Sequence, residues 1–121
     1  MPPEARRLLN DIGQAGMRIQ ELCAARSFEE YGRDAFLRPT VERYFITIGE
    51  AVGQLARVDV ATAEQLPEYR RIIAFRNALV HGYSTVDNRT VWEAVQERLP
   101  MLLAQIEQLL SGGNAAVDPN A

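Results

Sequence analysis

A chain of 121 residues, 47% of them hydrophobic, suits one ordinary domain with a single core and is short for two. Its single cysteine excludes an internal disulfide. Because it has neither a signal-peptide pattern nor an apolar run of bilayer length, we expect a soluble cytoplasmic protein with no membrane segment. With a formal charge of −3, the chain as a whole carries no net positive charge that would attract nucleic acid.

Apolar residues near the start recur at three- and four-residue steps, which is the period of an amphipathic helix. This pattern predicts a first helix that begins after Pro3 and ends at about Ala25. Ser27, with Glu30 three residues later, forms the sequence of a capping box. A short helix or an irregular segment is therefore predicted over residues 28–38.

A second long helix is predicted to open near Pro39, with an apolar stripe that reaches Leu55. Gly49 and Gly53 interrupt it at a spacing that allows another helix to approach closely, so we expect a close helix contact there. The pattern then weakens. One further turn of helix is predicted around residues 62–66.

The third predicted helix covers roughly residues 67–80, and Gly82 is well placed to stop it. Asp87 or Asn88 can cap a fourth long helix, which Pro100 should kink. From Ser111 the apolar period is lost. We therefore predict an all-α, up-and-down bundle of four helices, or five, over residues 1–110 and a disordered tail over residues 111–121.

The candidate functional residues lie where the third predicted helix ends. Arg76 precedes His81, the only histidine, by five residues. An arginine is a permanent, fork-shaped phosphate ligand, and a histidine both accepts and donates protons near neutral pH. Together they could cleave RNA without a metal. Nearby arginines predict a local basic patch, with a solvated polar face as the equal alternative; they are Arg70, Arg71, Arg76 and Arg89.

Helix geometry sets a condition on this pair. Five residues of ideal helix turn a side chain by about 140° in total, so Arg76 and His81 would not share a face. The conflict eases if the helix ends before His81 in a distorted turn. Asn77 offers an amide that could orient the site, and Glu50 of the second predicted helix could hold either His81 or Arg76.

These motifs resemble, in order and spacing, those of a known family. The segments concerned are Ile48-Gly49-Glu50-Ala51, Tyr69-Arg70-Arg71-Ile72-Ile73-Ala74-Phe75, Arg76-Asn77, His81-Gly82-Tyr83, Val86-Asp87, Val91-Trp92 and Leu99-Pro100. From about Leu8 to Leu110 the chain resembles the HepT family of the HEPN superfamily (higher eukaryotes and prokaryotes nucleotide-binding domains). Family members often have a Pro-Trp pair where this chain has Glu68-Tyr69, which we interpret as a packing change because an aromatic ring is kept.

The resemblance implies a dimeric HEPN-type bundle and a metal-independent RNA endonuclease that needs no cofactor. Arg76 and His81 would be its catalytic pair. It also implies the toxin of a type VII-like HepT/MntA toxin–antitoxin system, with tRNA as the substrate that the family suggests. The partner, an MntA-like minimal nucleotidyltransferase, would neutralise the toxin by attaching AMP to Tyr83, and the two proteins could join in a larger hetero-oligomer.

The chemistry of the residues is consistent with a homodimer. Cleavage of RNA by its own 2′-hydroxyl needs a base, an acid and stabilisation of a phosphorane, and one histidine cannot easily supply them all. Two copies would supply two of His81 and two of Arg76. Because the chain has one His and one Cys, it has no zinc-site spacing, and no glycine-rich phosphate loop precedes a helix, so no metal or cofactor is expected.

A second class of function stays open. The chain could be a non-catalytic HEPN binding module that partners a minimal nucleotidyltransferase, or binds a nucleotide or RNA, through the same polar residues. Arg76 could simply pair with Glu50 or Glu93 at the surface, and Glu50 could be a structural acid. Tyr83 could merely pack its ring.

Overall fold

The computed structural model describes residues 1–82 and 86–117, with side chains up to residue 112. Within these ranges the chain is helical and contains no strand, which confirms the all-α prediction. In chain order the elements are α1 (Pro3–Cys23), α2 (Phe28–Arg33), α3 (Leu37–Val58), α4 (Val60–Ala63), α5 (Tyr69–His81), α6 (Asn88–Glu93), the π-helical turn η1 (Ala94–Arg98) and α7 (Leu99–Val117).

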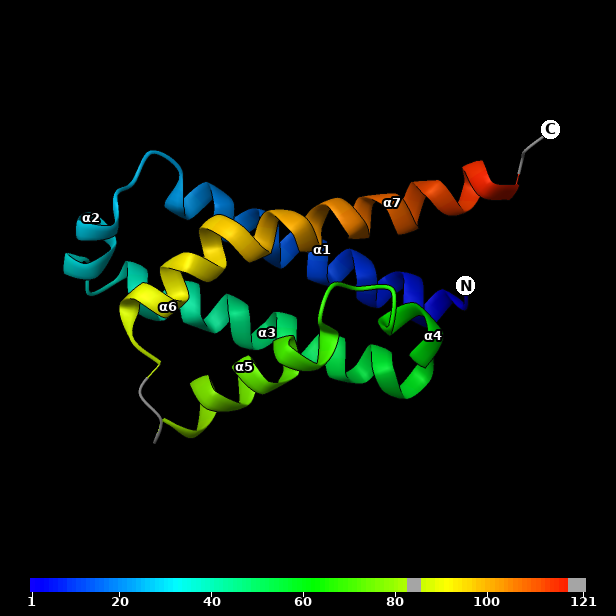
Figure 1. The fold of residues 1–121 in the computed structure, drawn as a ribbon, viewed down its shortest axis with the longest axis horizontal. Helices are drawn as coiled ribbons and strands as arrows, with labels where there is room; N and C mark the ends of the chain where they lie inside the picture. Colours follow the sequence, from blue (N-terminus) through cyan, green and yellow to red (C-terminus); the bar gives the residue numbers. More distant parts are fainter. Residues whose placement is uncertain (83–85, 118–121) are drawn as a thin grey trace.

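The long helices form a bundle in which neighbours run side by side. α1 packs against both α3 and α7, and α5 packs against α3 on the side away from α1 (Figure 1). The short helices α2 and α4 occupy the turns at the two ends of α3 (Figure 1). The predicted four long helices are thus α1, α3, α5 and the run from α6 to α7.

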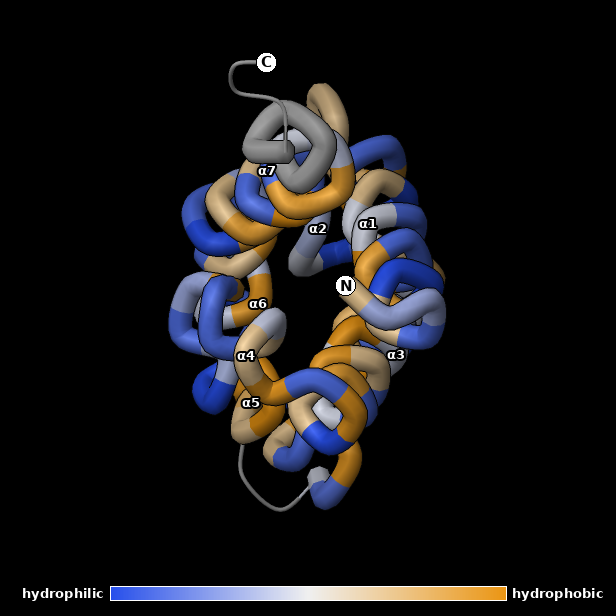
Figure 2. Tube along the Cα trace, turned by 90° about the vertical axis from the view of Figure 1, so that its right-hand side faces the viewer, coloured by the Kyte–Doolittle hydropathy of each residue, from blue (hydrophilic) through white to orange (hydrophobic). Residues whose placement is uncertain are grey.

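The core lies between α1, α3 and the run from α6 to α7. Buried apolar residues recur mostly at three- and four-residue steps along each of these helices, as the sequence predicts. The largest fully buried ones include Leu8, Leu9, Ile12, Ile19, Val41, Ile48, Val52, Leu55, Val91 and Leu99. Hydrophobic positions of α1 and α7 lie on the inner side of the bundle, with hydrophilic positions outside (Figure 2). None of the described helices is long and apolar enough to cross a membrane.

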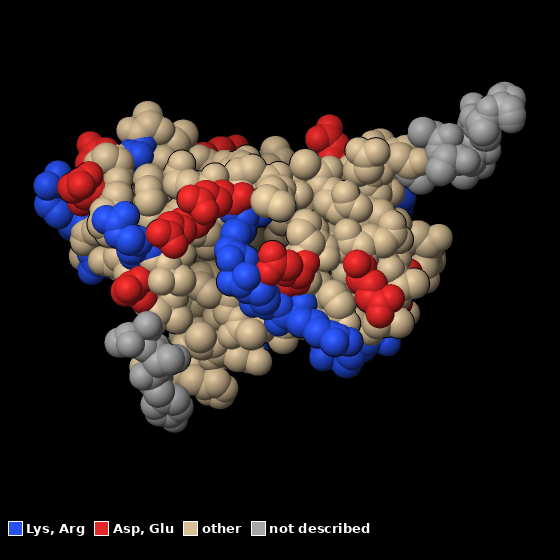
Figure 3. Space-filling model, in the orientation of Figure 1, with Lys and Arg blue, Asp and Glu red and all other residues tan. Residues whose placement is uncertain are grey.

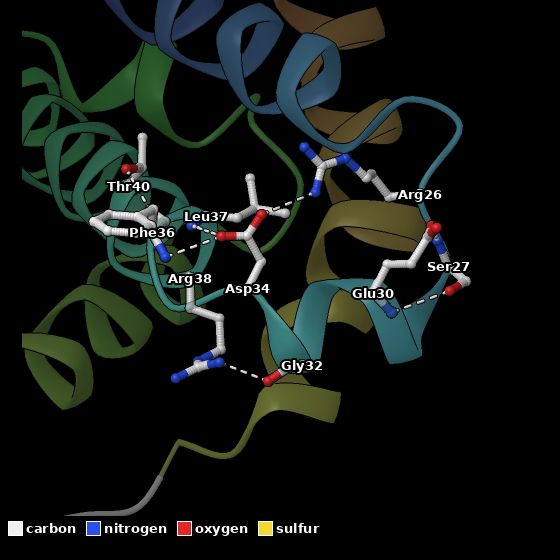
Figure 4. Close-up of polar contacts among 9 residues, drawn as sticks. All are labelled: Arg26, Ser27, Glu30, Gly32, Asp34, Phe36, Leu37, Arg38 and Thr40. Carbon is white, nitrogen blue, oxygen red and sulfur yellow. Dashed lines mark hydrogen bonds and ion pairs between the residues drawn. The ribbon is translucent and has the colours of Figure 1, made fainter.

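The turn between α1 and α3 is closed by short polar contacts, drawn in Figure 4. Ser27 and Glu30 form the predicted capping box at the start of α2. The carboxylate of Asp34 accepts hydrogen bonds from the backbone N–H groups of Phe36 and Leu37 and pairs with Arg26 at 3.1 Å. Because Asp34 satisfies these N–H groups, α3 begins ahead of Pro39, the residue at which we predicted the helix to open.

The helical turn after α3 lies slightly earlier than predicted. Asp59 accepts hydrogen bonds from the backbone N–H of Thr62 at 3.3 Å and from its hydroxyl at 2.6 Å. This cap starts α4 at Val60, so the helix covers Val60–Ala63 and overlaps only the first part of the predicted turn at residues 62–66.

The last helical run begins at the predicted cap, because the Asp87 side chain accepts a hydrogen bond from the backbone N–H of Thr90 at 2.8 Å. Where we predicted that Pro100 would kink the helix, the structure has a π turn just before Pro100. In this turn the amide of Leu99 donates to the carbonyl of Ala94. Pro100 has no N–H for the carbonyl one turn earlier, and a π turn is a usual response to a broken ladder. α7 continues to Val117, beyond the tail boundary predicted at Ser111, and residues 118–121 lie outside the described part.

Candidate active site

The predicted catalytic segment forms one regular helix, α5, which Gly82 ends. Gly82 adopts a left-handed conformation with φ 70°, and its N–H donates to the carbonyl of Ala78 at 3.3 Å, as a C-terminal glycine cap does. The prediction that Gly82 stops this helix is confirmed. The helix includes His81, however, so the early, distorted end that would swing the imidazole toward Arg76 does not occur.

Arg76 leaves α5 at the point where that helix comes closest to α3. A β-carbon added to Gly49 would lie 2.2 Å from the Cβ of Arg76 and 3.3 Å from the carbonyl oxygen of Ile72, so only glycine fits there. The close contact predicted for Gly49 is confirmed. Gly53 takes no part, because a β-carbon there would meet only the guanidinium of Arg57 at 3.9 Å.

The guanidinium of Arg76 is held by two polar partners. Its Nη2 donates to the Glu50 carboxylate at 3.1 Å, and its Nη1 donates to Oδ1 of Asn77 at 3.0 Å. Its Nε is buried and has no hydrogen-bond partner among the described residues. Of the two carboxylates considered for Arg76, Glu50 is therefore the one that binds it, and this contact joins α3 to α5.

His81 lies on another side of α5. Because the helix is regular, about 140° separates the directions in which Arg76 and His81 leave it. Asn77 stands one turn before His81, on the same exposed side. The structure thus brings together Arg76, Asn77 and Glu50, and Asn77 is the member of this group that shares the exposed side of α5 with His81. Tyr83 lies outside the described residues.

The four arginines near the motif do not form one basic patch. Arg89 lies over the ring of Phe28, 4.2 Å from its centroid, and Arg71 pairs with Glu68 at 2.8 Å. On the face shown in Figure 3, acidic side chains border the basic ones. The mixed, solvated surface, which we held as the alternative, describes these residues better than a local positive field.

A small groove that the sequence did not reveal lies between α3, α5 and the α6–α7 run. It has a volume of about 140 Å³, and two of its lining residues, Phe45 and Phe75, meet edge to face with ring centroids 5.3 Å apart. Arg71, Arg98 and Glu68 also line it. Only tertiary packing joins these residues, so no local pattern could have indicated the groove, and neither Arg76 nor His81 lines it.

The described side chains contain no group of three or more His, Cys, Asp or Glu residues placed to hold a metal ion. What the geometry does offer is a fixed guanidinium that can bind a phosphate. An exposed imidazole on the same helix can transfer a proton.

Comparison with known proteins places this helix bundle in a family. The family described as "Ribonuclease HepT-like" matches residues 12–109. A protein of Thermococcus cleftensis named "Probable ribonuclease HepT" is 31% identical over 101 residues, which cover 84% of this chain and 91% of that protein. A "Putative RNase" of Caldanaerobacter subterraneus subsp. tengcongensis is 31% identical over 84 residues, or 69% of this chain and 74% of its own.

An archaeal relative covers slightly more of the chain. A "Putative RNase" of Methanocaldococcus jannaschii is 25% identical over 107 residues, which are 88% of each chain. No solved structure matches at the significance that these relatives reach. The match spans α5 with its Arg76 and His81, the glycine that faces Arg76, and the core of the bundle. The chain therefore belongs to the HepT-like ribonuclease family.

Proposed function

We propose that the protein is a metal-independent RNA endonuclease in which Arg76 binds the phosphate and His81 transfers protons. The observation that carries this proposal is the fixed guanidinium of Arg76, held by Glu50 and Asn77 on the helix that ends at His81. The names of the relatives, which describe ribonucleases, support the same activity.

The chemistry requires only what these side chains supply. A base removes the proton from the 2′-hydroxyl, whose oxygen attacks the neighbouring phosphorus. The bond to the 5′-oxygen breaks, and an acid protonates that leaving oxygen, so the products are a 2′,3′-cyclic phosphate and a 5′-hydroxyl. A guanidinium stabilises the extra negative charge of the phosphorane between these steps.

A second copy of the chain completes the site in this proposal. None of the 13 residues of α5 is fully buried, and Val80 is 46% exposed. At about 100° per residue, Ile73 and Val80 lie between Arg76 and His81 around the helix. A two-fold contact across this apolar ridge would place Arg76 of one copy beside His81 of the other, so that one imidazole acts as base and the other as acid.

We propose control by an MntA-like nucleotidyltransferase that modifies Tyr83. The phenolic oxygen of Tyr83 would attack the α-phosphorus of ATP, the bond to the β-phosphate would break, and pyrophosphate would leave with the phenol proton released. The added AMP would stand two residues from His81 and block the site by charge and bulk. Mass spectrometry of the protein co-expressed with its partner should show AMP on the Tyr83 peptide; a neutralised toxin with only unmodified peptide would refute this control.

Cleavage of labelled total tRNA in excess EDTA tests the catalytic proposal. Wild-type protein should yield 2′,3′-cyclic phosphate ends, and folded His81→Ala should yield none. Arg76→Gln should also lower cleavage. Arg18→Gln on α1 is its matched control and should leave cleavage unchanged, since Arg18 also forms an ion pair at 3.1 Å with a glutamate but lies on another helix. If neither wild type nor His81→Ala cleaves RNA, with Tyr83 unmodified, the non-catalytic binding module is left as the function; equal cleavage by both would instead remove His81 from the mechanism.

A further inference from the structure

α5 carries an exposed stripe that extends well beyond the catalytic pair. Arg70, Ala74, Asn77 and His81 are all exposed. Their spacing of four, three and four residues keeps their directions within about 60° of one another around the helix. His81 is therefore one end of a continuous strip of surface, and Arg70 is the other end.

The charge of Arg70 is not neutralised by an ion pair. Its guanidinium lies over the Tyr69 ring, 5.5 Å from the centroid, and its Nε donates to the Tyr69 hydroxyl at 3.2 Å. Among the described residues no carboxylate lies within ion-pair distance of it, although Glu64 is near enough to act on its charge. An aromatic ring that orients a guanidinium leaves its remaining N–H groups available to an anion.

The adjacent arginine shows the opposite arrangement. Arg71 forms an ion pair with Glu68 at 2.8 Å and lines the groove, on a different side of α5. The two arginines share charge, size and helical turn. They differ in whether a carboxylate occupies the guanidinium and in whether the side chain lies on the stripe of His81.

We propose that this stripe is a binding track for a single strand of RNA and that Arg70 holds a phosphate remote from the cleaved bond. Eleven residues of helix place Arg70 about 16 Å from His81, and a stacked strand advances about 3.4 Å per nucleotide, so the phosphate lies roughly four or five nucleotides away. Ala74, with its small side chain, leaves room for the strand between them. The inference rests on the proposed ribonuclease activity and adds to it the form of the substrate.

A series of RNA oligonucleotides that extend from one to eight nucleotides on either side of a single cleavage point tests the track. In wild type, kcat/KM should rise severalfold as the longer extension on one side reaches about five nucleotides, the span set by the helix rise and the strand advance. Arg70→Gln should abolish this gain and leave the shortest substrate unaffected, whereas Arg71→Gln should retain it. Arg70→Lys, which keeps the charge, should recover part of the gain.

Salt dependence gives an independent measurement. For long substrates, Arg70→Gln should reduce the slope of log KM against log salt by about 0.7, the loss of one phosphate contact on a single strand. Arg71→Gln should leave the slope unchanged. Circular dichroism of both variants controls for folding, which neither exposed side chain should disturb.

Equal behaviour of Arg70→Gln and Arg71→Gln on every substrate, in a wild type that cleaves RNA and requires His81, would overturn the track alone. A protein that cleaves no RNA would instead overturn the proposed function and the track together. If Arg70→Gln leaves cleavage intact but weakens binding of the nucleotidyltransferase, the stripe is a protein contact and the RNA track is wrong.

Discussion

Oδ1 of Asn77 accepts a hydrogen bond from Nη1 of its sequence neighbour Arg76 at 3.0 Å, although the two residues leave α5 about 100° apart. This contact draws the guanidinium from the side that faces α3 toward the exposed side of the helix. His81 stands one turn beyond Asn77 on that exposed side. Asn77 therefore binds Arg76 and lies between Arg76 and His81 around the helix, two residues that a regular helix holds apart.

Substitution of Gly49 tests how the site depends on the spacing of two helices. Gly49→Ala should lower the free energy of unfolding by about 1–3 kcal/mol, since the new methyl group would overlap the Cβ of Arg76. It should lower RNA cleavage as well, because α5 must move. Gly53→Ala, in the same helix but in open space, should raise stability by about 0.5–1 kcal/mol. Urea unfolding of both variants measures the difference, and equal effects would contradict this account.

Glu50 is expected to act as a positioning residue for Arg76. Glu50→Gln should reduce kcat/KM by no more than about fivefold, because the carboxylate is 56% exposed and exposed pairs contribute about 0–1 kcal/mol. Glu21→Gln breaks a pair of the same 3.1 Å length on α1 and should leave the rate unchanged. If Glu50→Gln lowers KM and speeds cleavage, the carboxylate competes with the substrate phosphate and does not position the arginine.

Acid should weaken the turn between α2 and α3. The backbone N–H of Leu37, then Arg26 and the N–H of Phe36, lower the pKa of Asp34. A lowered folded-state pKa means that this stabilisation is complete above the unfolded pKa of about 3.9 and is lost as pH falls through the lower, folded value. Asp34→Asn should therefore be less stable than wild type at pH 6, and the gap should close below about pH 4. Urea midpoints across this range measure it, and a gap independent of pH would refute the assignment.

Tyr31 offers a test in the core. Its side chain is fully buried against Trp92, with ring centroids 5.4 Å apart, and its hydroxyl has no hydrogen-bond partner among the described residues. A buried hydroxyl without a partner costs about 1–3 kcal/mol, so Tyr31→Phe should keep or raise the free energy of unfolding. A loss greater than about 1 kcal/mol in urea unfolding would show that the hydroxyl is satisfied in solution.

The same residue predicts a response to alkali. Burial, followed by the charge of Glu42, raises the pKa of Tyr31. Because the folded state keeps the phenol neutral, its contribution is complete below the unfolded pKa of about 10 and is lost as pH rises above that value. Wild type should therefore lose stability above about pH 10 more steeply than Tyr31→Phe does. Parallel slopes for the two proteins would contradict this.

Local signals predicted the elements of the fold, because caps and apolar periods act within a few residues. The capping box of Ser27 and the cap of Asp87 start their helices where expected, and Gly82 ends α5. The observed start of a helix differs from the predicted start where a side chain outside the apolar pattern caps the helix with a hydrogen bond. Asp34 does so for α3, and Asp59 does so for α4.

The sequence predicted which residues form the candidate site better than it predicted their arrangement. Gly49 was expected at a close helix contact and Glu50 near Arg76 or His81, and the structure places both against Arg76. Whether α5 would end in a distorted turn before His81 was left open, since a C-terminal glycine fixes where a helix stops only to within a residue. The groove at Phe45 and Phe75 depends on contacts between distant helices, which a single sequence does not encode in any local pattern.

The missing β-carbon at position 49 also helps to judge which relatives are expected to be active. The candidate residues Arg76, Asn77 and His81 all belong to α5, yet the space that Arg76 occupies is set by Gly49 of α3. If the proposed activity holds, a homologue that keeps these three residues but carries a side chain at the position of Gly49 would be expected to fold less stably and to be impaired as an enzyme. A search that uses the α5 motif alone would not recognise such a homologue as impaired, whereas the absence of the glycine would identify it.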